Sequence, residues 1–202
     1  DSIRGEAEPW SERGCRVLLL AAYDTAFDDG PLQSAHVAPI ALVFLSNLLR
    51  PDAQETFRYF ASQGVSVRVI SGDNPITVAQ VATRAGIENA DRYVDATTLS
   101  TEQDFEEAVK YYTVFGRVTP EQKRYLVRAF QKQGHTVAMT GDGVNDVLAL
   151  KDANCGIAMA SGSQAASQVA QIVLLNSQFS AMPAIVAEGR RVINNIQRSA
   201  SL

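Results

Sequence analysis

The sequence has few cysteines and few histidines, and it has no long apolar run. Two of its 202 residues are cysteine and two are histidine. Cys15 and Cys155 lie far apart in the chain, which argues against a disulfide scaffold and favours buried free thiols in a reducing compartment. No stretch reaches the ~18 consecutive apolar residues of a membrane span, the best candidate being the short run at residues 37–44. A signal-peptide pattern is absent as well.

Basic charge is scarce too. The formal net charge is −4, so there is no positive field for a nucleic acid, and we expect no nucleic-acid partner. No Gly-Lys dipeptide occurs, which excludes a P-loop NTPase. What is present suits one α/β domain with a substantial core and a smaller appendage, since 46% of the residues are hydrophobic and 20% are charged.

Short apolar runs alternate with helical patterns between about residue 50 and residue 175. The runs are nearly continuous in apolar residues, as expected of strands buried on both faces of a parallel sheet. The predicted strands are residues 65–70, 111–115, 136–140, 155–159 and 171–174. The predicted helices are residues 51–62, 76–85, 120–133 and 147–153. This alternation predicts a doubly wound, mostly parallel, Rossmann-like α/β sheet.

The two ends of the chain have a different pattern. Before residue 49 we expect a helix that ends within residues 10–14, then strands at 16–22 and 40–46 joined by a loop at 24–39, which together form an incomplete second module. The apolar spacing predicts one long amphipathic helix at residues 179–198, with arginines at polar positions. The chain begins at Asp1 without a methionine and stops at Leu202 inside that helical pattern, so we expect a segment of a longer protein.

The strongest chemical signal is the run Thr140-Gly141-Asp142-Gly143-Val144-Asn145-Asp146. It follows an apolar strand, and ligands of open α/β sheets bind outside the carboxyl ends of strands. Two carboxylates four residues apart, on a loop that glycine allows to turn tightly, can bind Mg²⁺ through oxygen. An ordinary acidic turn is the alternative reading. An EF-hand is excluded because Val144 occupies a ligand position and no glutamate closes the loop.

Two further loops follow predicted strands. Ser71-Gly72-Asp73-Asn74 leads into a helix, and its hydroxyl and backbone N–H groups suit a phosphate, although an ordinary N-cap is the alternative. Lys123 lies one turn into the helix that starts after Thr119, where Gln122 completes a capping box. Its ammonium can reach a phosphate at the sheet edge, or it is a solvated surface charge. Together the three loops resemble a phosphoryl-transfer site without its nucleophile.

These motifs resemble those of the P-type (E1–E2) cation-transporting ATPases, within the haloacid dehalogenase (HAD) superfamily. Residues 139–153 (MTGDGVNDVLALKDA) are similar to the hinge signature of that family, with Val147-Leu148 where Ala-Pro is usual. Residues 69–74 resemble its Thr-Gly-Asp-Asn segment, with Ser71 in place of threonine, and residues 117–123 resemble its Arg-x-x-Pro-x-x-Lys segment. The resemblance covers nearly the whole chain and implies an HAD-like fold.

The resemblance also implies roles for individual residues. Asp142 would ligate Mg²⁺, and Asp146 would orient Lys123 and help to form the metal site. The residues implied to act in catalysis are Lys123, Asp146 and Ser71. The residues implied to bind phosphoryl oxygens are Ser71, Gly72, Asn145 and Lys123. The residues implied to contact the nucleotide are Arg16, Asp73 and Arg117.

For the whole protein, the family implies ATP as substrate, Mg²⁺ as cofactor and an aspartyl-phosphate intermediate whose hydrolysis drives cation transport. Residues 1–48 would be the end of a nucleotide-binding domain, 49–178 a phosphorylation domain, and 179–202 a stalk helix toward a membrane, which we expect to be the bacterial plasma membrane. The partners would be the transported cation and the nucleotide, actuator and transmembrane domains of the same chain.

The family's nucleophile lies in Asp-Lys-Thr-Gly-Thr, a segment that the 202 residues do not contain. We therefore expect the isolated chain to lack ATPase and phosphatase activity. Two other interpretations stay open, which are a non-catalytic module that binds Mg²⁺ or nucleotide, and a stand-alone HAD-type phosphatase. The transported ion cannot be read from these residues, because selectivity resides in membrane helices.

Overall fold

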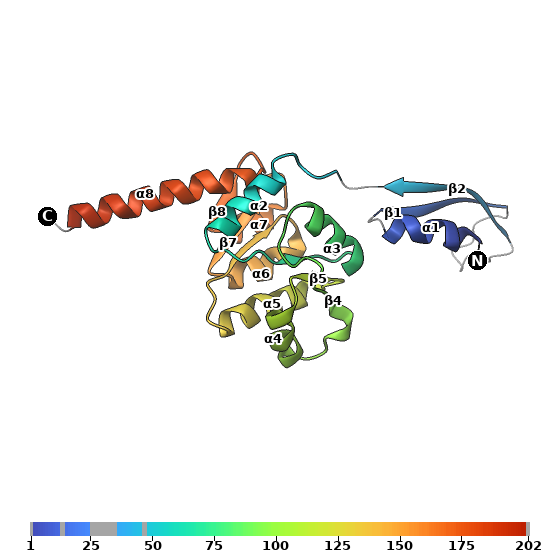
Figure 1. The fold of residues 1–202 in the computed structure, drawn as a ribbon, viewed down its shortest axis with the longest axis horizontal. Coiled ribbons are helices and arrows are strands. Elements are labelled where there is room, and N and C mark those ends of the chain that lie inside the picture. The colour runs from blue at the N-terminus through green and yellow to red at the C-terminus, as the bar shows by residue number, and fades with distance from the viewer. Residues whose placement is uncertain (1, 13–14, 25–35, 46–47, 201–202) are drawn as a thin grey trace. The chain divides into compact units, whose positions relative to one another are not determined.

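The computed structural model describes residues 2–12, 15–24, 36–45 and 48–200 (Figure 1). The chain divides into two compact units, Asp1–Leu48 and Leu49–Leu202. Each unit is described by itself.

The first unit is a helix packed on an antiparallel strand pair. Helix α1 (Ser2–Glu12) precedes strands β1 (Arg16–Tyr23) and β2 (Val37–Leu45), which pair from Arg16↔Leu45 to Tyr23↔Val37. Trp10 of α1 packs on Phe44 of β2 in a tilted arrangement, with ring centroids 4.9 Å apart. The second strand starts earlier than the predicted residue 40, and most of the predicted loop 24–39 lies outside the described residues.

The second unit alternates strands and helices. Its strands are β3 (Val69–Ile70), β4 (Tyr93–Asp95), β5 (Val114–Gly116), β6 (Ala138–Gly141), β7 (Cys155–Met159) and β8 (Ile172–Leu174). Its α-helices are α2 (Ala53–Ser62), α3 (Pro75–Arg84), α4 (Glu102–Tyr111), α5 (Pro120–Lys132), α6 (Val147–Asp152), α7 (Gln164–Val169) and α8 (Met182–Ala200). Short 3-10 turns are η2 (Ala96–Thr98), η3 (Val144–Asp146) and η4 (Phe179–Ala181).

The strands of this unit form two parallel three-stranded sheets, with orders β3-β5-β4 and β6-β7-β8. The predicted α/β class with mostly parallel strands is therefore confirmed. The predicted single sheet is observed as two halves, with β3 and β6 each at an edge of its own half among the described strands. Since all strands within a half run the same way, the loops after them gather at one edge.

Both halves of the sheet are covered by helices on two faces. Neighbouring residues of a strand point to opposite faces, so each strand contacts helices on both sides. In β5, Val114 packs on Ala79 and Ala82 of α3, whereas Phe115 belongs to the cluster formed by α4 and α5. In β7, Ala158 packs in the cluster of α5, α6 and α7, whereas Ile157 packs with residues of α2 and α8. Helix α5 contributes residues to the cores of both halves, and it joins them.

Helix α5 follows its predicted course closely. Thr119 Oγ1 accepts from the amide of Gln122 at 3.3 Å, and Gln122 Oε1 accepts from the amide of Thr119 at 3.0 Å. This reciprocal cap satisfies two of the unpaired amides at the start of the helix, as the sequence predicts. Leu126 and Val127 are buried on successive positions, so the helix can face both halves of the fold.

Several predicted bounds were wrong. The strand expected at 65–70 is reduced to β3, and Tyr111, expected in a strand, ends α4 instead. Helix α4 and strand β4 were not predicted, although Thr101 and Asp104 form a capping box at the start of α4. The helix expected from residue 179 begins as the turn η4 and continues as α8. The length of a strand depends on its backbone pairing with strands that are distant in the sequence, and the local apolar pattern does not predict where that pairing ends.

Both cysteines are free thiols and are half-buried rather than buried. Among the described helices, none is both long enough and apolar enough to cross a membrane.

Candidate functional site

The loop after β6 wraps around the carboxylate of Asp146. Lys123 Nζ donates to Asp146 Oδ1 at 2.7 Å, and the amide of Gly143 donates to Asp146 Oδ2 at 3.1 Å. The side chains of Lys123 and Asp146 are 14% and 9% exposed, so this ion pair is largely withdrawn from water. Both oxygens of Asp146 thus have a donor, and the pair holds α5 against the loop.

Gly141 makes this close packing possible. A Cβ at residue 141 would lie 2.6 Å from Asp146 Cβ and 2.8 Å from its Cγ, distances that side chains do not tolerate. The loop can therefore fold back on Asp146 because residue 141 has no side chain. Asp142, between the two glycines, is exposed, as are Val144 and Asn145 of the turn η3. None of the described residues donates a hydrogen bond to the carboxylate of Asp142.

The loop after β3 is joined to the loop after β5. The amide of Arg117 donates to the Asp73 carbonyl at 2.8 Å, and the amide of Val118 donates to the Ser71 carbonyl at 3.0 Å. Ser71 Oγ accepts from the amide of Asp73 at 3.1 Å, so this hydroxyl has a local partner. Asn74 caps α3 through its side-chain oxygen, which accepts from Ile76 at 2.9 Å. The alternative interpretation of residues 71–74, an ordinary helix N-cap, therefore holds for Asn74.

Arg117 has an unusual backbone and an acidic partner. Its φ is +51°, a left-handed conformation that costs a residue with a Cβ roughly 1–2 kcal/mol. Its Nη1 donates to Asp95 Oδ2 at 2.8 Å. Hydrogen bonds from the side chain and amide of Thr97, with a further contribution from Arg117, lower the pKa of Asp95. Sequence reasoning missed Asp95, whose one signal is its position as the cap of η2.

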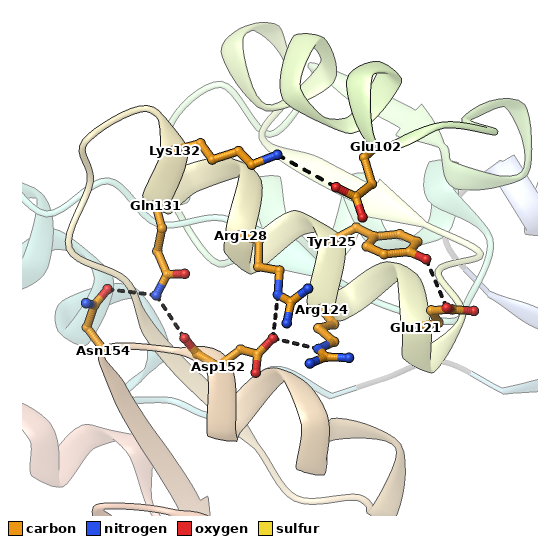
Figure 2. Close-up of polar contacts among 9 residues, drawn as sticks. All are labelled: Glu102, Glu121, Arg124, Tyr125, Arg128, Gln131, Lys132, Asp152 and Asn154. Atoms are coloured by element: carbon orange, nitrogen blue, oxygen red, sulfur yellow. Dashed lines mark hydrogen bonds and ion pairs between the residues drawn. The ribbon is translucent and has the colours of Figure 1, made fainter.

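A second link joins α5 to the last residue of α6, whereas Asp146 of the first link precedes that helix. Arg124 Nε and Arg128 Nε donate to Asp152 Oδ2 at 2.6 Å and 2.7 Å (Figure 2). Gln131 Nε2 donates to the Asp152 carbonyl at 2.8 Å and to Asn154 Oδ1 at 3.1 Å. Figure 2 shows these α5 side chains pointing at the end of α6. Local sequence patterns do not indicate this cluster, because Asp152 lies more than 20 residues along the chain from each of its partners on α5.

The predicted site residues thus fall into two groups. Helix α5 and the residues just before it, which include Arg117, connect these groups. Lys123, Asp146 and the loop of Asp142 form one group, and the loops of Ser71 and Arg117 form the other. Within the described part of the chain, no hydrogen bond links Ser71 or Gly72 to Asp142 or Lys123. Arg16 begins β1 of the first unit.

The donor set around Asp142 is small for a complete metal site. No cluster of three or more His, Cys, Asp or Glu side chains suited to a metal occurs among the described residues. Asp142 presents an exposed carboxylate, which is the hard oxygen ligand that Mg²⁺ prefers. Since Mg²⁺ typically binds through one or two carboxylates with waters and phosphate oxygens, the residues present fit part of such a site.

The parallel α/β fold and the acidic loop at a strand end are those of a known class. Residues 5–154 match the haloacid dehalogenase-like hydrolase family, and the chain belongs to that family.

Its curated relatives are cation-transporting ATPases. A calcium-transporting ATPase, CtpE, of Mycobacterium bovis is 54% identical over 198 residues, which are 98% of this chain and 24% of the relative. The probable cation-transporting ATPase exp7 of Streptococcus pneumoniae is 43% identical over 203 residues, covering 100% of this chain and 26% of the relative. The chain therefore spans about a quarter of the length of these relatives. The resemblance to P-type ATPases is confirmed.

Solved structures agree on the fold. A zinc-transporting PIB-type ATPase in its E2.Pi state superposes with a TM-score of 0.68 at 24% identity, over 98% of this chain and 26% of that one. The catalytic domain of a CPx-ATPase, CopB-B, superposes with a TM-score of 0.55 at 21% identity, over 74% of this chain and 49% of that one.

Proposed function

We propose that this chain is the cytoplasmic phosphorylation-domain portion of a P-type ATPase that couples ATP hydrolysis to cation transport through an aspartyl phosphate. The observation that supports it most is the 54% identity to a cation-transporting ATPase over 98% of the chain, including the loop that holds the Lys123–Asp146 pair. In this proposal residues 1–48 belong to a nucleotide-binding domain, 49–178 to the phosphorylation domain and 179–202 to a stalk toward the membrane.

The reaction would begin with the aspartate of the Asp-Lys-Thr-Gly-Thr segment, which the 202 residues do not contain. Its carboxylate oxygen attacks the γ-phosphorus of ATP, a C–O–P bond forms, and the bond between the γ-phosphorus and the bridging oxygen of ADP breaks. Water then cleaves the acyl phosphate to carboxylate and inorganic phosphate. Phosphoryl transfer depends mainly on positioning and charge stabilisation, which is the work assigned here to the residues of the loops.

Lys123 supplies positive charge to the phosphoryl oxygens, and Asp146 holds its ammonium in place. The geometry that supports this is the 2.7 Å ion pair, in which Asp146 is also tied to the loop through Gly143. Asn145, with Ser71 and the Gly72 amide, would donate to the same oxygens. For these last three, the support is their place on loops after parallel strands, together with the family resemblance.

Asp142 would hold Mg²⁺, and Asp146 would help to form the metal site. When bound, the ion neutralises phosphate charge. The exposed carboxylate of Asp142 supports this assignment, whereas both oxygens of Asp146 already have hydrogen-bond donors. Arg117 and Asp73, joined through their backbones, would contact the nucleotide, as would Arg16.

The edges of the two sheet halves fit the same proposal. Strands β3 and β6 each lack a second neighbour among the described strands, and unpaired edges accept a further strand. We infer that the segment carrying the nucleophilic aspartate adds there, which would place its carboxyl end beside the loops of Ser71 and Asp142.

The transported ion is proposed to be Ca²⁺. The support is that several relatives with 52–54% identity are calcium-transporting ATPases. A location in the bacterial plasma membrane follows from the same proposal.

The test uses the whole protein in membrane vesicles with ATP labelled at the γ-phosphate. We expect Ca²⁺-dependent labelling that survives acid and is released by hydroxylamine, as an acyl phosphate requires. Asp142→Asn should reduce the rate of labelling at least tenfold, which corresponds to a rise of about 1.4 kcal/mol or more in the activation barrier. Asp91→Asn, an exposed carboxylate outside the site, is the matched control and should label normally. Hydroxylamine-resistant label, or unchanged labelling in Asp142→Asn, would contradict the mechanism, and labelling that depends on another cation would contradict the assignment of Ca²⁺.

A further inference from the structure

The loop after β7 lies against the backbone of Asp142. The amide of Ser163 donates to the carbonyl oxygen of Asp142 at 2.6 Å. A Cβ added at Gly162 would overlap that carbonyl oxygen and would stand 2.9 Å from the carbonyl carbon and from Cα of Asp142. Because these are backbone atoms, no rotamer change of Asp142 can relieve the overlap. Any side chain at residue 162 therefore forces either the peptide of Asp142 or the backbone of residue 162 to move.

This loop is itself held from two sides. On the β8 side, the amide of Ala160 donates to the Leu174 carbonyl at 3.0 Å, and the amide of Ser161 donates to Ser177 Oγ at 2.9 Å. On the other side, Ser163 caps α7, its Oγ accepting from the amide of Ala165 at 3.1 Å. Helix α7 is anchored in the core through a fully buried Ala166. The loop is thus a fixed support rather than a free strand connection.

We propose that Gly162 and Ser163 are positioning residues, which hold the backbone of Asp142 where its carboxylate can bind a cation. This inference rests on the proposed function. Asp142 needs such support because its exposed carboxylate has no donor among the described residues. The position of the Asp142 carboxylate therefore depends on the backbone of Asp142. Gly162 fixes that backbone by close contact, and Ser163 fixes it by a hydrogen bond. Loss of a group that orients a metal ligand typically costs 10–100-fold in metal affinity.

The first test is a pair of glycine substitutions in the 202-residue chain, with Mn²⁺ as a probe for the Mg²⁺ site and free Mn²⁺ measured by electron paramagnetic resonance. Gly162→Ala should weaken Mn²⁺ binding by about 10–100-fold. Gly189→Ala is the matched control, because a Cβ at residue 189 meets nothing within 4 Å. Equal Mn²⁺ affinity in Gly162→Ala and the unaltered chain would overturn the proposal.

The second test does not depend on how well Gly162→Ala folds. Ser163→Pro and Ser163→Ala both remove the hydroxyl that caps α7, but only proline removes the amide that donates to Asp142. The φ of Ser163 is −68°, which proline adopts without strain. Ser163→Pro should therefore bind Mn²⁺ several-fold more weakly than Ser163→Ala. Equal affinity of these two variants would also overturn the proposal.

Hydrogen exchange at residues 141–146 separates this inference from the proposed function. Gly162→Ala should speed exchange of those amides relative to Gly189→Ala, with or without a cation. If the unaltered chain binds no Mn²⁺ but exchange still rises in Gly162→Ala, the positioning role is supported and the proposed cation site is wrong. If the unaltered chain binds Mn²⁺ and exchange is unchanged in Gly162→Ala, the positioning role is wrong.

Discussion

Replacing Lys123 by methionine should destabilise the second unit strongly, although Lys123 contributes little to its apolar core. Methionine keeps the unbranched shape and removes the ammonium. Asp146 would then keep one donor, the Gly143 amide, and would lose the charge that neutralises it. Removing one partner of a buried ion pair costs about 3–5 kcal/mol, and the 14% and 9% exposure of the two side chains favours the lower end, about 3 kcal/mol.

Thermal unfolding followed by circular dichroism measures this loss. For a unit of this size, about 3 kcal/mol corresponds to a fall in the unfolding midpoint of roughly 6–12 °C. Lys151→Met is the matched control, because Lys151 is exposed on α6, and it should stay within about 0.5 kcal/mol of the unaltered chain.

A double-mutant cycle isolates the pair itself. Asp146→Asn turns an amide group toward one of the two donors and should also destabilise, whereas Lys123→Met with Asp146→Asn leaves no buried charge. We expect the double variant to lose less stability than the sum of the single losses, by about 1–3 kcal/mol. Additive losses, or a loss below about 0.5 kcal/mol in Lys123→Met, would refute the reasoning that this pair is desolvated and coupled.

Two further predictions concern the helices that carry the site. Asp152→Asn should cost about 1–2 kcal/mol at neutral pH, since Asp152 accepts from two arginines and its side chain is 19% exposed. Partial burial raises the pKa of Asp152, but the hydrogen bonds from Arg124 and Arg128 outweigh it and hold the pKa below the ordinary value of 3.8. Because the folded form holds that proton less tightly, the stabilisation is present above the unfolded pKa and is lost as the pH falls through the folded pKa. The stability difference between the unaltered chain and Asp152→Asn should therefore shrink below about pH 4, and a difference that grows on acidification would contradict this assignment. Thr119→Ala should cost about 1 kcal/mol in thermal unfolding by removing the cap of α5, whereas Thr136→Ala, at an exposed threonine outside that cap, serves as the control.

The local patterns of the sequence determined the class of fold, the start of α5 and the chemistry of the three loops. A capping box joins residues three apart, and the turn of residues 140–146 uses glycines within the same few positions, so both can be read without knowing the fold. Apolar runs likewise predict buried parallel strands. The sequence also predicted that Lys123 and Asp146 act together, but through resemblance to a family rather than through spacing.

Tertiary structure alone decided which loops touch. The contact between Gly162 and Asp142 follows from the parallel pairing of β6 with β7, which brings their carboxyl ends together. The clamp of Asp152 by Arg124 and Arg128 depends on how α5 packs across two sheet halves. Such contacts join residues 20 or more positions apart, and the sequence between them leaves no local mark of the pairing. The amino-acid sequence determines which charged and polar side chains are available, and the packing of the folded chain determines which of them come into contact.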